Sequence, residues 1–221
     1  MEISPDLWKA ATDFRFLLNQ GYPRDASLTL VGNRYNLDSD HRHLLRRGVF
    51  SSSVVEQRKN KKVSLEEIRG MTVAIDGYNC LITLESALKA KAILLADDAF
   101  IRDISGVSGT YRESPETTQA LDLIVDLLIA AASAEVLFLL DAPISASGKL
   151  AARIRGLMAE RGLPGDAQAV KVPERVMARY EGIIVTSDTA LIDQNEQVFD
   201  LAGHLITQHL RIPFIDMKKS T

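Results

Sequence analysis

Hydrophobic residues recur at helical spacing through the first 50 positions of the chain. A first helix is predicted over residues 6–20, on the apolar positions Leu7, Trp8, Ala11, Phe14, Leu17 and Leu18. A second helix is expected from a cap at Asp25 to Gly32, and a third from a cap at Asp38 or Ser39 to Gly48. The polar run over residues 56–62 indicates a linker or an exposed loop. Residues 1–62 are therefore predicted to form a small helical domain and its linker.

From residue 63 the pattern changes to short apolar runs that alternate with helical stretches. Ser64 and Glu67 have the spacing of a capping box and open a short helix. The apolar runs predict strands over residues 71–75, 93–95, 135–140, 167–172 and 182–186. Helical periodicity predicts helices over residues 79–91, 115–132 and 148–161, and one more that starts at 188. This alternation is typical of an α/β domain with a doubly wound, mostly parallel sheet, which we expect over residues 63–221.

Composition narrows the class of protein. Hydrophobic residues make up 46% of the chain and charged residues 25%, which is ordinary for a globular protein. Cys80 is the single cysteine, so no disulfide within the chain is expected. The N-terminal residues have acids where a signal peptide has bases, and no apolar run is long enough to cross a bilayer. We therefore expect a cytoplasmic protein without a membrane partner; the oligomeric state stays open, a homo-oligomer included.

Charge is distributed unevenly along the chain. Residues 1–70 contain 12 basic and 9 acidic side chains, whereas the remainder contains 14 and 20. A basic front and an acidic back suit a division between nucleic-acid binding and metal chemistry. Chance explains this imbalance equally well, because many soluble proteins have one of similar size.

Three of the predicted strands end in an aspartate. These residues are Asp76, Asp141 and Asp188. In an open α/β sheet the ligand crevice lies at the carboxyl ends of the strands, so the three carboxylates are expected to converge if their strands are parallel neighbours. Converging carboxylates raise one another's pKa values unless a cation neutralises them, and such oxygen ligands suit Mg²⁺ or Mn²⁺. A metal held there polarises a phosphoryl oxygen.

Helix capping is the alternative explanation for each aspartate, and Asp188 precedes a helix start. Asp193 lies slightly more than one helical turn after Asp188 and is a less certain fourth ligand. Asn79 follows Asp76 by three residues, where it could orient a ligand or cap the next helix. Asp97, Asp98 and Asp103 are expected to be solvated surface residues.

Two further segments contain groups suited to phosphate binding. Ser145, Ser147 and Lys149 precede a helix, although the full P-loop spacing is missing because no glycine stands five residues before Gly148. An ordinary serine-rich helix start explains them equally well. The polar loop from Arg102 to Arg112 contains Tyr111, so it could clamp a strand of nucleic acid by stacking and arginine contacts, or be a simple mobile connection.

The motifs at the strand ends resemble a known superfamily. Ile75-Asp-Gly-Tyr-Asn79, the strand that ends at Asp141, and Thr186-Ser-Asp188 before a helix are similar to PIN-like nucleases, especially the NYN branch. This resemblance covers about residues 70–215. The front part, with Leu30-Val-Gly-Asn-Arg-Tyr-Asn36, looks like a prokaryotic family that joins a helical segment to such a domain.

The resemblance implies a fold, an activity and a set of site residues. It implies RNA cleavage that depends on Mg²⁺ or Mn²⁺, with Asp76, Asp141 and Asp188 as metal ligands, Asp193 as a further one, and Asn79 shaping the site. The family often has another acid between the first and middle strands, and here Glu113, Glu116 and Asp122 compete for that role. The leading hypothesis is a metal-dependent ribonuclease. The alternatives are a catalytically weak RNA-binding adaptor and a phosphohydrolase of small substrates.

Overall fold

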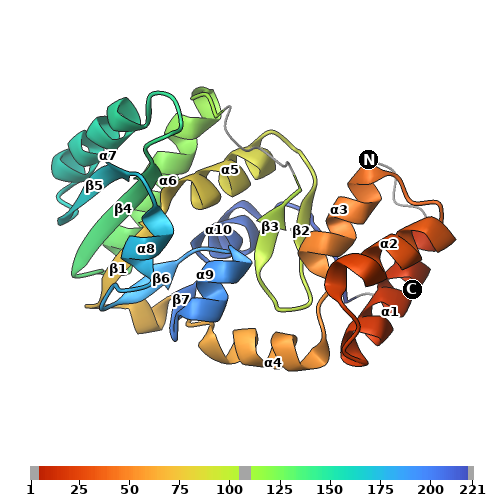
Figure 1. Cartoon of the computed structure of the whole chain (residues 1–221). Helices are drawn as coiled ribbons and strands as arrows, with labels where there is room; N and C mark the ends of the chain where they lie inside the picture. The colour runs from red at the N-terminus through yellow and green to blue at the C-terminus, as the bar shows by residue number, and fades with distance from the viewer. Residues whose placement is uncertain (1–4, 105–110, 219–221) are drawn as a thin grey trace. The chain divides into compact units, whose positions relative to one another are not determined.

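The computed structural model describes residues 5–104 and 111–218, and it divides into two compact units (Figure 1). Unit 1 comprises residues 1–60, 91–104 and 213–221, and unit 2 comprises residues 61–90 and 105–212. The first boundary lies close to the expected one at residue 62. The expected division into two continuous segments differs from the structure, because residues 91–104 and 213–218 contribute to the core of unit 1.

Unit 1 is a group of helices that packs on a small sheet. Its helices are α1 (Pro5–Asn19), α2 (Arg24–Arg34), α3 (Ser39–Gly48) and α4 (Ser52–Lys61). Its strands are β2 (Ile93–Leu95), β3 (Ile101–Asp103) and β8 (Ile215–Asp216), in the order β3-β2-β8. Leu94 of β2 and Met217 after β8 are buried in the same apolar core as Leu7, Phe14 and Leu44 of the helices. Short helices alone bury too little apolar surface to be stable, so the distant strands supply the missing part of the core.

Several expectations for unit 1 need correction. Helix α2 continues past Gly32 to Arg34, and the glycine leaves room for the Arg42 guanidinium, which lies where a Cβ would be. The expected linker over residues 56–62 is largely helix α4, whose Arg58 is buried and pairs with Asp98 at 3.0 Å. The expected cap of α3 is confirmed, since the Asp38 side chain accepts a hydrogen bond from the His41 N–H at 2.8 Å.

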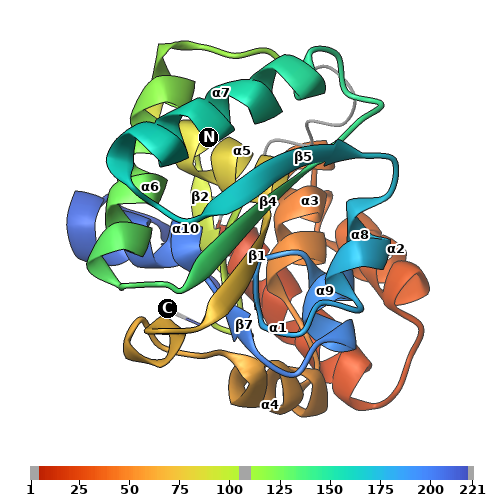
Figure 2. The same cartoon turned by 90° about the vertical axis from the view of Figure 1, so that its left-hand side faces the viewer.

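Unit 2 is built on a five-stranded sheet in which all neighbours are parallel. The strands are β1 (Thr72–Asp76), β4 (Glu135–Asp141), β5 (Gly165–Val170), β6 (Ile183–Val185) and β7 (Val198–Phe199). Their order is β5-β4-β1-β6-β7, so β1 is central (Figure 2). The α/β class and the helical N-terminal region are thus confirmed. Strand β2 was also found by sequence, but it belongs to the sheet of unit 1.

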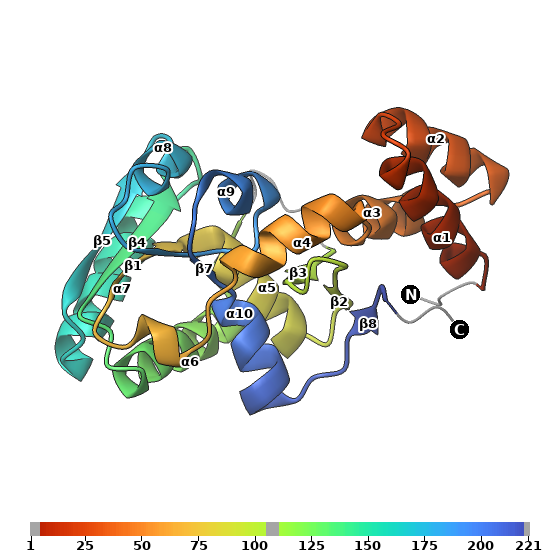
Figure 3. The same cartoon turned by 90° about the horizontal axis from the view of Figure 1, so that it is seen from below.

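Helices cover both faces of the sheet in unit 2. They are α5 (Gly77–Leu88), α6 (Pro115–Ala130), α7 (Ser147–Arg161), α8 (Pro173–Met177), α9 (Thr189–Gln194) and α10 (Leu201–His204). The 3₁₀ turn η1 (Glu66–Ile68) precedes β1, and the π-helical segment η2 (Leu205–Leu210) follows α10. Figure 3 shows α6 and α7 on one side of the sheet and α8 and α9 on the other. Ala74, Leu139 and Ile184 form the apolar layer beneath α8 and α9.

The neighbouring strands β1 and β6 lead into helices on opposite faces of the sheet. Strand β1 leads into α5, which packs on α6, whereas β6 leads into α9 on the other face (Figure 3). This is the topological switch point of a doubly wound sheet, where ligands bind outside the carboxyl ends of the strands. Within the described residues, no helix is long and apolar enough to cross a membrane.

Candidate active site at the carboxyl edge of the sheet

The three aspartates end three adjacent parallel strands, as the sequence predicts. Asp76 is the last residue of β1, Asp141 is the last residue of β4, and Asp188 follows β6 and caps α9. Because β4 and β6 flank β1 on its two sides, the three side chains leave the same edge of the sheet. The topology therefore places the three residues at one edge of the sheet, and the shared acidic site itself stays a prediction.

Hydrogen bonds join the ends of β1 and β6 at the switch point. The Thr186 hydroxyl donates to an Asp76 carboxylate oxygen at 3.0 Å, and its oxygen accepts from the Asp188 N–H at 3.0 Å. The Asn79 side-chain oxygen accepts from the N–H of Ser187 at 2.9 Å and from its hydroxyl at 3.0 Å. The Asn79 side-chain oxygen therefore does not cap a helix but fixes the β6–α9 loop against α5.

The helix caps at this edge are also present. Asp76 accepts a long hydrogen bond of 3.4 Å from the Asn79 N–H at the start of α5. One oxygen of Asp188 accepts from the N–H groups of Ala190 at 2.9 Å and Leu191 at 3.1 Å. Capping does not prevent these two residues from contributing to an acidic edge, because each carboxylate oxygen has more than one lone pair.

The electrostatic environment of Asp76 disfavours its charge. Burial raises the pKa of Asp76 to about 7, against the lowering effect of hydrogen bonds from Thr186 and Asn79, and the negative charges of Asp188 and Asp141 raise it further. Burial also raises the pKa of Asp141, with a further contribution from the charge of Glu174. A carboxyl group near its pKa at neutral pH is unusual, and such groups concentrate at functional sites.

The fit of this edge to a divalent cation is partial. The donors are hard carboxylate oxygens, and their mutual repulsion is of the kind that a cation relieves. However, within residues 5–104 and 111–218 no group of three or more His, Cys, Asp or Glu side chains is placed so as to hold a metal ion. Asp193 is exposed on α9, where its carbonyl oxygen accepts from Lys61 Nζ at 2.7 Å. The chemistry of the donors fits a metal, whereas a complete ligand set is not formed.

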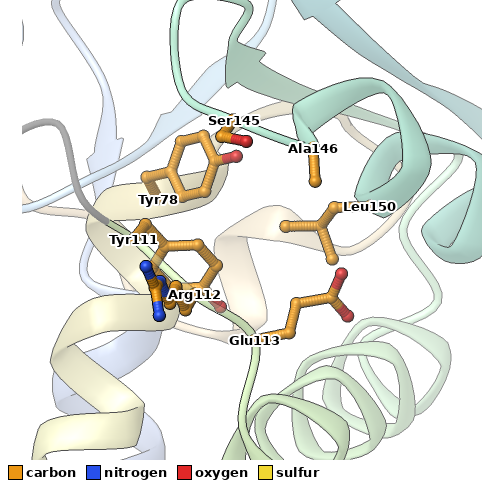
Figure 4. Close-up of a pocket in the computed structure, with 7 residues that line it drawn as sticks. All are labelled: Tyr78, Tyr111, Arg112, Glu113, Ser145, Ala146 and Leu150. Carbon is orange, nitrogen blue, oxygen red and sulfur yellow. The ribbon is translucent and has the colours of Figure 1, made fainter.

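Beside the acidic edge lies a pocket of about 430 Å³ (Figure 4). It is lined by Tyr78, Tyr111, Arg112, Glu113, Ser145, Ala146 and Leu150. Two of the residues predicted to bind substrate, Ser145 and Arg112, are exposed and line this pocket. Ser147 is buried and its hydroxyl donates to the Ala142 carbonyl oxygen at 3.2 Å, so it shapes the β4–α7 loop. Lys149 is exposed on α7 and does not belong to the lining.

Arg102 is not a substrate-binding residue. It lies in β3 of unit 1, is 2% exposed, and donates to both oxygens of Asp98 at 2.8 and 2.9 Å. Asp97, Asp98 and Asp103 are buried rather than solvated, because arginines neutralise them: Arg15 binds Asp97 at 2.9 Å and Arg47 lies 3.6 Å from Asp103. Charged residues that the sequence predicts on the surface therefore lie in the interior of unit 1.

Tyr111 belongs to the pocket lining but is not an exposed loop residue. It is buried, and its hydroxyl donates to Glu85 of α5 instead of facing solvent. Glu85 accepts as well from the Thr117 hydroxyl at 2.8 Å and pairs with Lys89 at 3.2 Å. Residues 105–110 of the expected RNA-clamping loop lie outside the described residues.

Of the three acids that compete for the additional position, only Glu113 lines the pocket; it pairs with Arg153 at 2.6 Å. Glu116 accepts from the Ser114 hydroxyl at 2.7 Å, and Asp122 pairs with Arg161 at 3.2 Å. Sequence reasoning missed Glu174, which is close enough to Asp141 to affect its pKa. The available signal was its place just after β5, the next parallel strand.

Two family models match the chain in consecutive segments. "Domain of unknown function (DUF5616)" matches residues 65–204, and "Protein of unknown function (DUF434)" matches residues 6–61. The chain belongs to the DUF5616 family. The two DUF segments meet close to the expected boundary at residue 62. The DUF5616 segment contains all five strands of the parallel sheet together with Asp76, Asp141 and Asp188.

A relative of similar length supports this assignment. The chain is 34% identical over 200 residues to "Uncharacterized protein MJ0935" of Methanocaldococcus jannaschii, an alignment that covers 90% of this chain and 95% of the relative. No solved structure matches the chain. The similarity to this relative therefore extends over both the DUF434 and the DUF5616 parts of the chain.

Proposed function

We propose that this DUF5616 protein is a PIN-like, metal-dependent ribonuclease whose active site is the carboxyl edge of the five-stranded sheet. The observation that supports the proposal is the placement of Asp76, Asp141 and Asp188 at the ends of three adjacent parallel strands, where the other two charges help to raise the pKa of Asp76. The edge lies at the switch point, the usual place for a ligand in this architecture.

The three aspartates are the residues that would hold a divalent cation. Mg²⁺ or Mn²⁺ bound there would supply Lewis-acid activation of the scissile phosphate. Thr186 and Asn79 hold the ends of β1 and β6 in register through the hydrogen bonds described above, so they position Asp76 and Asp188. Near neutral pH, Asp76 exists as a mixture of acid and carboxylate, which suits it to release its proton when a cation or substrate binds.

A single-stranded RNA is the proposed substrate because the pocket beside the edge combines aromatic rings with an arginine. Tyr78, Tyr111 and Arg112 are groups that bind bases and phosphates of an unpaired strand. Exposed Lys149, in the first turn of α7 and four residues after Ser145, adds a positive charge to this segment. A double helix keeps its bases stacked and paired, so they are not available to such a pocket.

One observation favours a second function, that of an RNA-binding adaptor without cleavage. The described residues contain no formed group of metal ligands, and Asp188 is already engaged as a helix cap. In that case the acidic edge would stabilise the loops, and RNA would bind through the pocket alone.

The test is cleavage of a panel of single-stranded RNAs by the purified full chain in Mn²⁺ or Mg²⁺, with EDTA as the stop. Asp141→Asn should remain folded and lose on the order of 100-fold or more in rate, because carboxylates that act as one unit fail together. Asp166→Asn is the matched control, since Asp166 is the second residue of β5 and lies toward the amino ends of the same parallel strands. RNA left intact by the metal-loaded wild type, yet bound equally by wild type and Asp141→Asn, would replace the nuclease with the adaptor.

A further inference from the structure

We propose that the pocket lined by Tyr78, Tyr111 and Ser145 is a binding site for a single nucleobase, next to the acidic edge. This inference takes its polymer, RNA, from the proposed function, but it concerns binding rather than cleavage. The pocket measures about 430 Å³, which lies within the range of roughly 300–1,000 Å³ that is usual for small-molecule sites.

The walls of the pocket suit a flat aromatic ligand. Tyr78 and Tyr111 meet edge to face, with ring centroids 4.9 Å apart and planes inclined at 63°, so their rings form two sides of a corner. Leu150 and Ala146 provide an apolar side opposite the tyrosines (Figure 4). Base-aromatic stacking is sequence-tolerant and strong, because every base has a π-face.

A hydrogen bond fixes the Tyr111 ring in place. The Tyr111 hydroxyl donates to Glu85, and the Thr117 hydroxyl lies 3.2 Å from the Tyr111 hydroxyl oxygen. Glu85 is itself held by Thr117 at 2.8 Å and by Lys89 at 3.2 Å. A ring that is already ordered loses little conformational entropy when a ligand stacks on it.

The Tyr78 hydroxyl is the polar group of the pocket that most clearly points to a ligand. Tyr78 is 4% exposed, and within the described residues its hydroxyl oxygen is buried without a hydrogen-bond partner. A buried hydroxyl without a partner is costly, so native proteins rarely keep one. Figure 4 shows this hydroxyl directed toward Ser145, whose exposed side chain would turn aside to admit a ligand atom.

The charged groups at the pocket favour a base with its phosphate over a bare anion. Glu113 places a carboxylate at the wall, which accepts from an amino group of a base and repels a phosphate. Arg112 supplies the guanidinium that a phosphate requires. Tyr78 follows Asp76 by two residues and Ser145 follows Asp141 by four, so a nucleotide bound here lies beside the proposed scissile position.

The experiment measures binding of AMP, GMP, CMP and UMP to the full chain by isothermal titration calorimetry in EDTA. Ribose 5-phosphate, which has the sugar and phosphate but no base, is the ligand control. At least one nucleotide should bind at least about 5-fold more tightly than ribose 5-phosphate, because stacking supplies the difference.

Two tryptophan variants test the location. Ser145→Trp fills the pocket from an exposed position and should weaken nucleotide binding about 10-fold or more. Ala159→Trp adds the same bulk at an exposed position of α7 outside the pocket, and its affinity should equal that of the wild type. Equal affinities of the two variants, or of ribose 5-phosphate and all four nucleotides, would overturn the proposal.

Tyr78→Phe tests the role of the hydroxyl. It removes an oxygen that has no partner, so the melting temperature should stay the same or rise, while affinity for at least one nucleotide should fall roughly 3- to 10-fold. Unchanged affinity for all four nucleotides would refute a hydrogen bond from Tyr78 to the base.

The two proposals can fail separately. If nucleotides bind but RNA is not cleaved, only the proposed function is overturned. If RNA is cleaved but no nucleotide binds more tightly than ribose 5-phosphate, only the base-binding site is overturned.

Discussion

The Thr186 hydroxyl lies 3.0 Å from the Asp76 carboxylate, and this contact ties the end of β6 to the end of β1. The same oxygen accepts from the Asp188 N–H, so one threonine connects two of the three strand-end aspartates. Thr186→Val should lower the free energy of unfolding by about 1–3 kcal/mol, because it leaves buried groups without their partner. Urea unfolding measures the change. Thr186→Ser keeps the hydroxyl and removes only the methyl group, so it should be more stable than Thr186→Val; equal instability of the two variants would show that the hydroxyl bonds contribute no more than the packing of the methyl group.

The raised pKa of Asp76 should appear as a dependence of stability on pH. Its folded-state pKa of about 7 exceeds the ordinary value of 3.8, so between those values the folded state binds more protons than the unfolded state. The stability contributed by the protonated group is complete below about pH 4 and is lost as pH rises toward 7. Asp76→Asn should therefore match wild type at pH 4 and exceed it by on the order of 2–4 kcal/mol at pH 8.

Asp166→Asn provides the control for this pH dependence, because hydrogen bonds from Gln168 and the Ala167 N–H lower the pKa of Asp166. Its effect should have the opposite sign, with stability relative to wild type falling as pH rises. Denaturant melts at several pH values measure both variants. A constant difference between Asp76→Asn and wild type from pH 4 to 8 would show that Asp76 titrates normally.

Metal binding should stabilise the folded chain if the acidic edge holds a cation. A ligand at a hundred times its dissociation constant adds about 2.7 kcal/mol, equivalent to roughly 5–10 °C in melting temperature for a chain of this size. Mn²⁺ should produce such a shift in wild type at pH 7.5 and none in Asp188→Asn. The absence of a shift in wild type at millimolar Mn²⁺ would argue for the adaptor.

Gly77 should be required for the close approach of α5 to β4. A Cβ on Gly77 would lie 2.9 Å from the Leu139 carbonyl oxygen and 2.5 Å from Leu140 Cδ2. Gly77→Ala should therefore destabilise the chain by about 1–3 kcal/mol through overpacking. Gly156 in α7 has open space around it, so Gly156→Ala should stabilise by up to about 1 kcal/mol. Thermal melts compare the two, and a stabilising Gly77→Ala would contradict the tight contact.

The buried charges of unit 1 should be essential to its fold. Asp98 is 0% exposed and pairs with Arg58 at 3.0 Å and Arg102 at 2.8 Å, and both guanidinium groups lie over the Phe50 ring. Asp98→Ala removes the carboxylate and should cost about 3–5 kcal/mol, because buried charges lose their partner. The exposed Asp40→Ala should change stability little. Equal effects in urea unfolding would show that the Asp98 pairs are unimportant.

The sequence by itself determined the elements whose pattern is local. Apolar runs that stop at Asp76, Asp141 and Asp188 defined three strands and the polarity of their ends, because a buried parallel strand must be apolar and its following loop polar. Helical periodicity likewise predicted the start of α6 at Pro115, where the structure also shows Ser114 as the cap. The charge pattern gave wrong predictions for α4, expected to be a linker, and for Arg102, expected to contact substrate. A charged side chain is predicted to be exposed as long as its partner is unknown.

Tertiary structure alone decided which strands are neighbours, where the switch point lies and what each charged group contacts. Strand β2 looks like a member of the main sheet in sequence, yet it pairs with β3 and β8. The link between Thr186 and Asp76 spans 110 positions, and the bond from Tyr111 to Glu85 spans 26. Such contacts depend on the packing of elements that are distant in sequence, and no local preference encodes that distance. Hence the acidic edge could be inferred from the residues, whereas the pocket beside it required the fold.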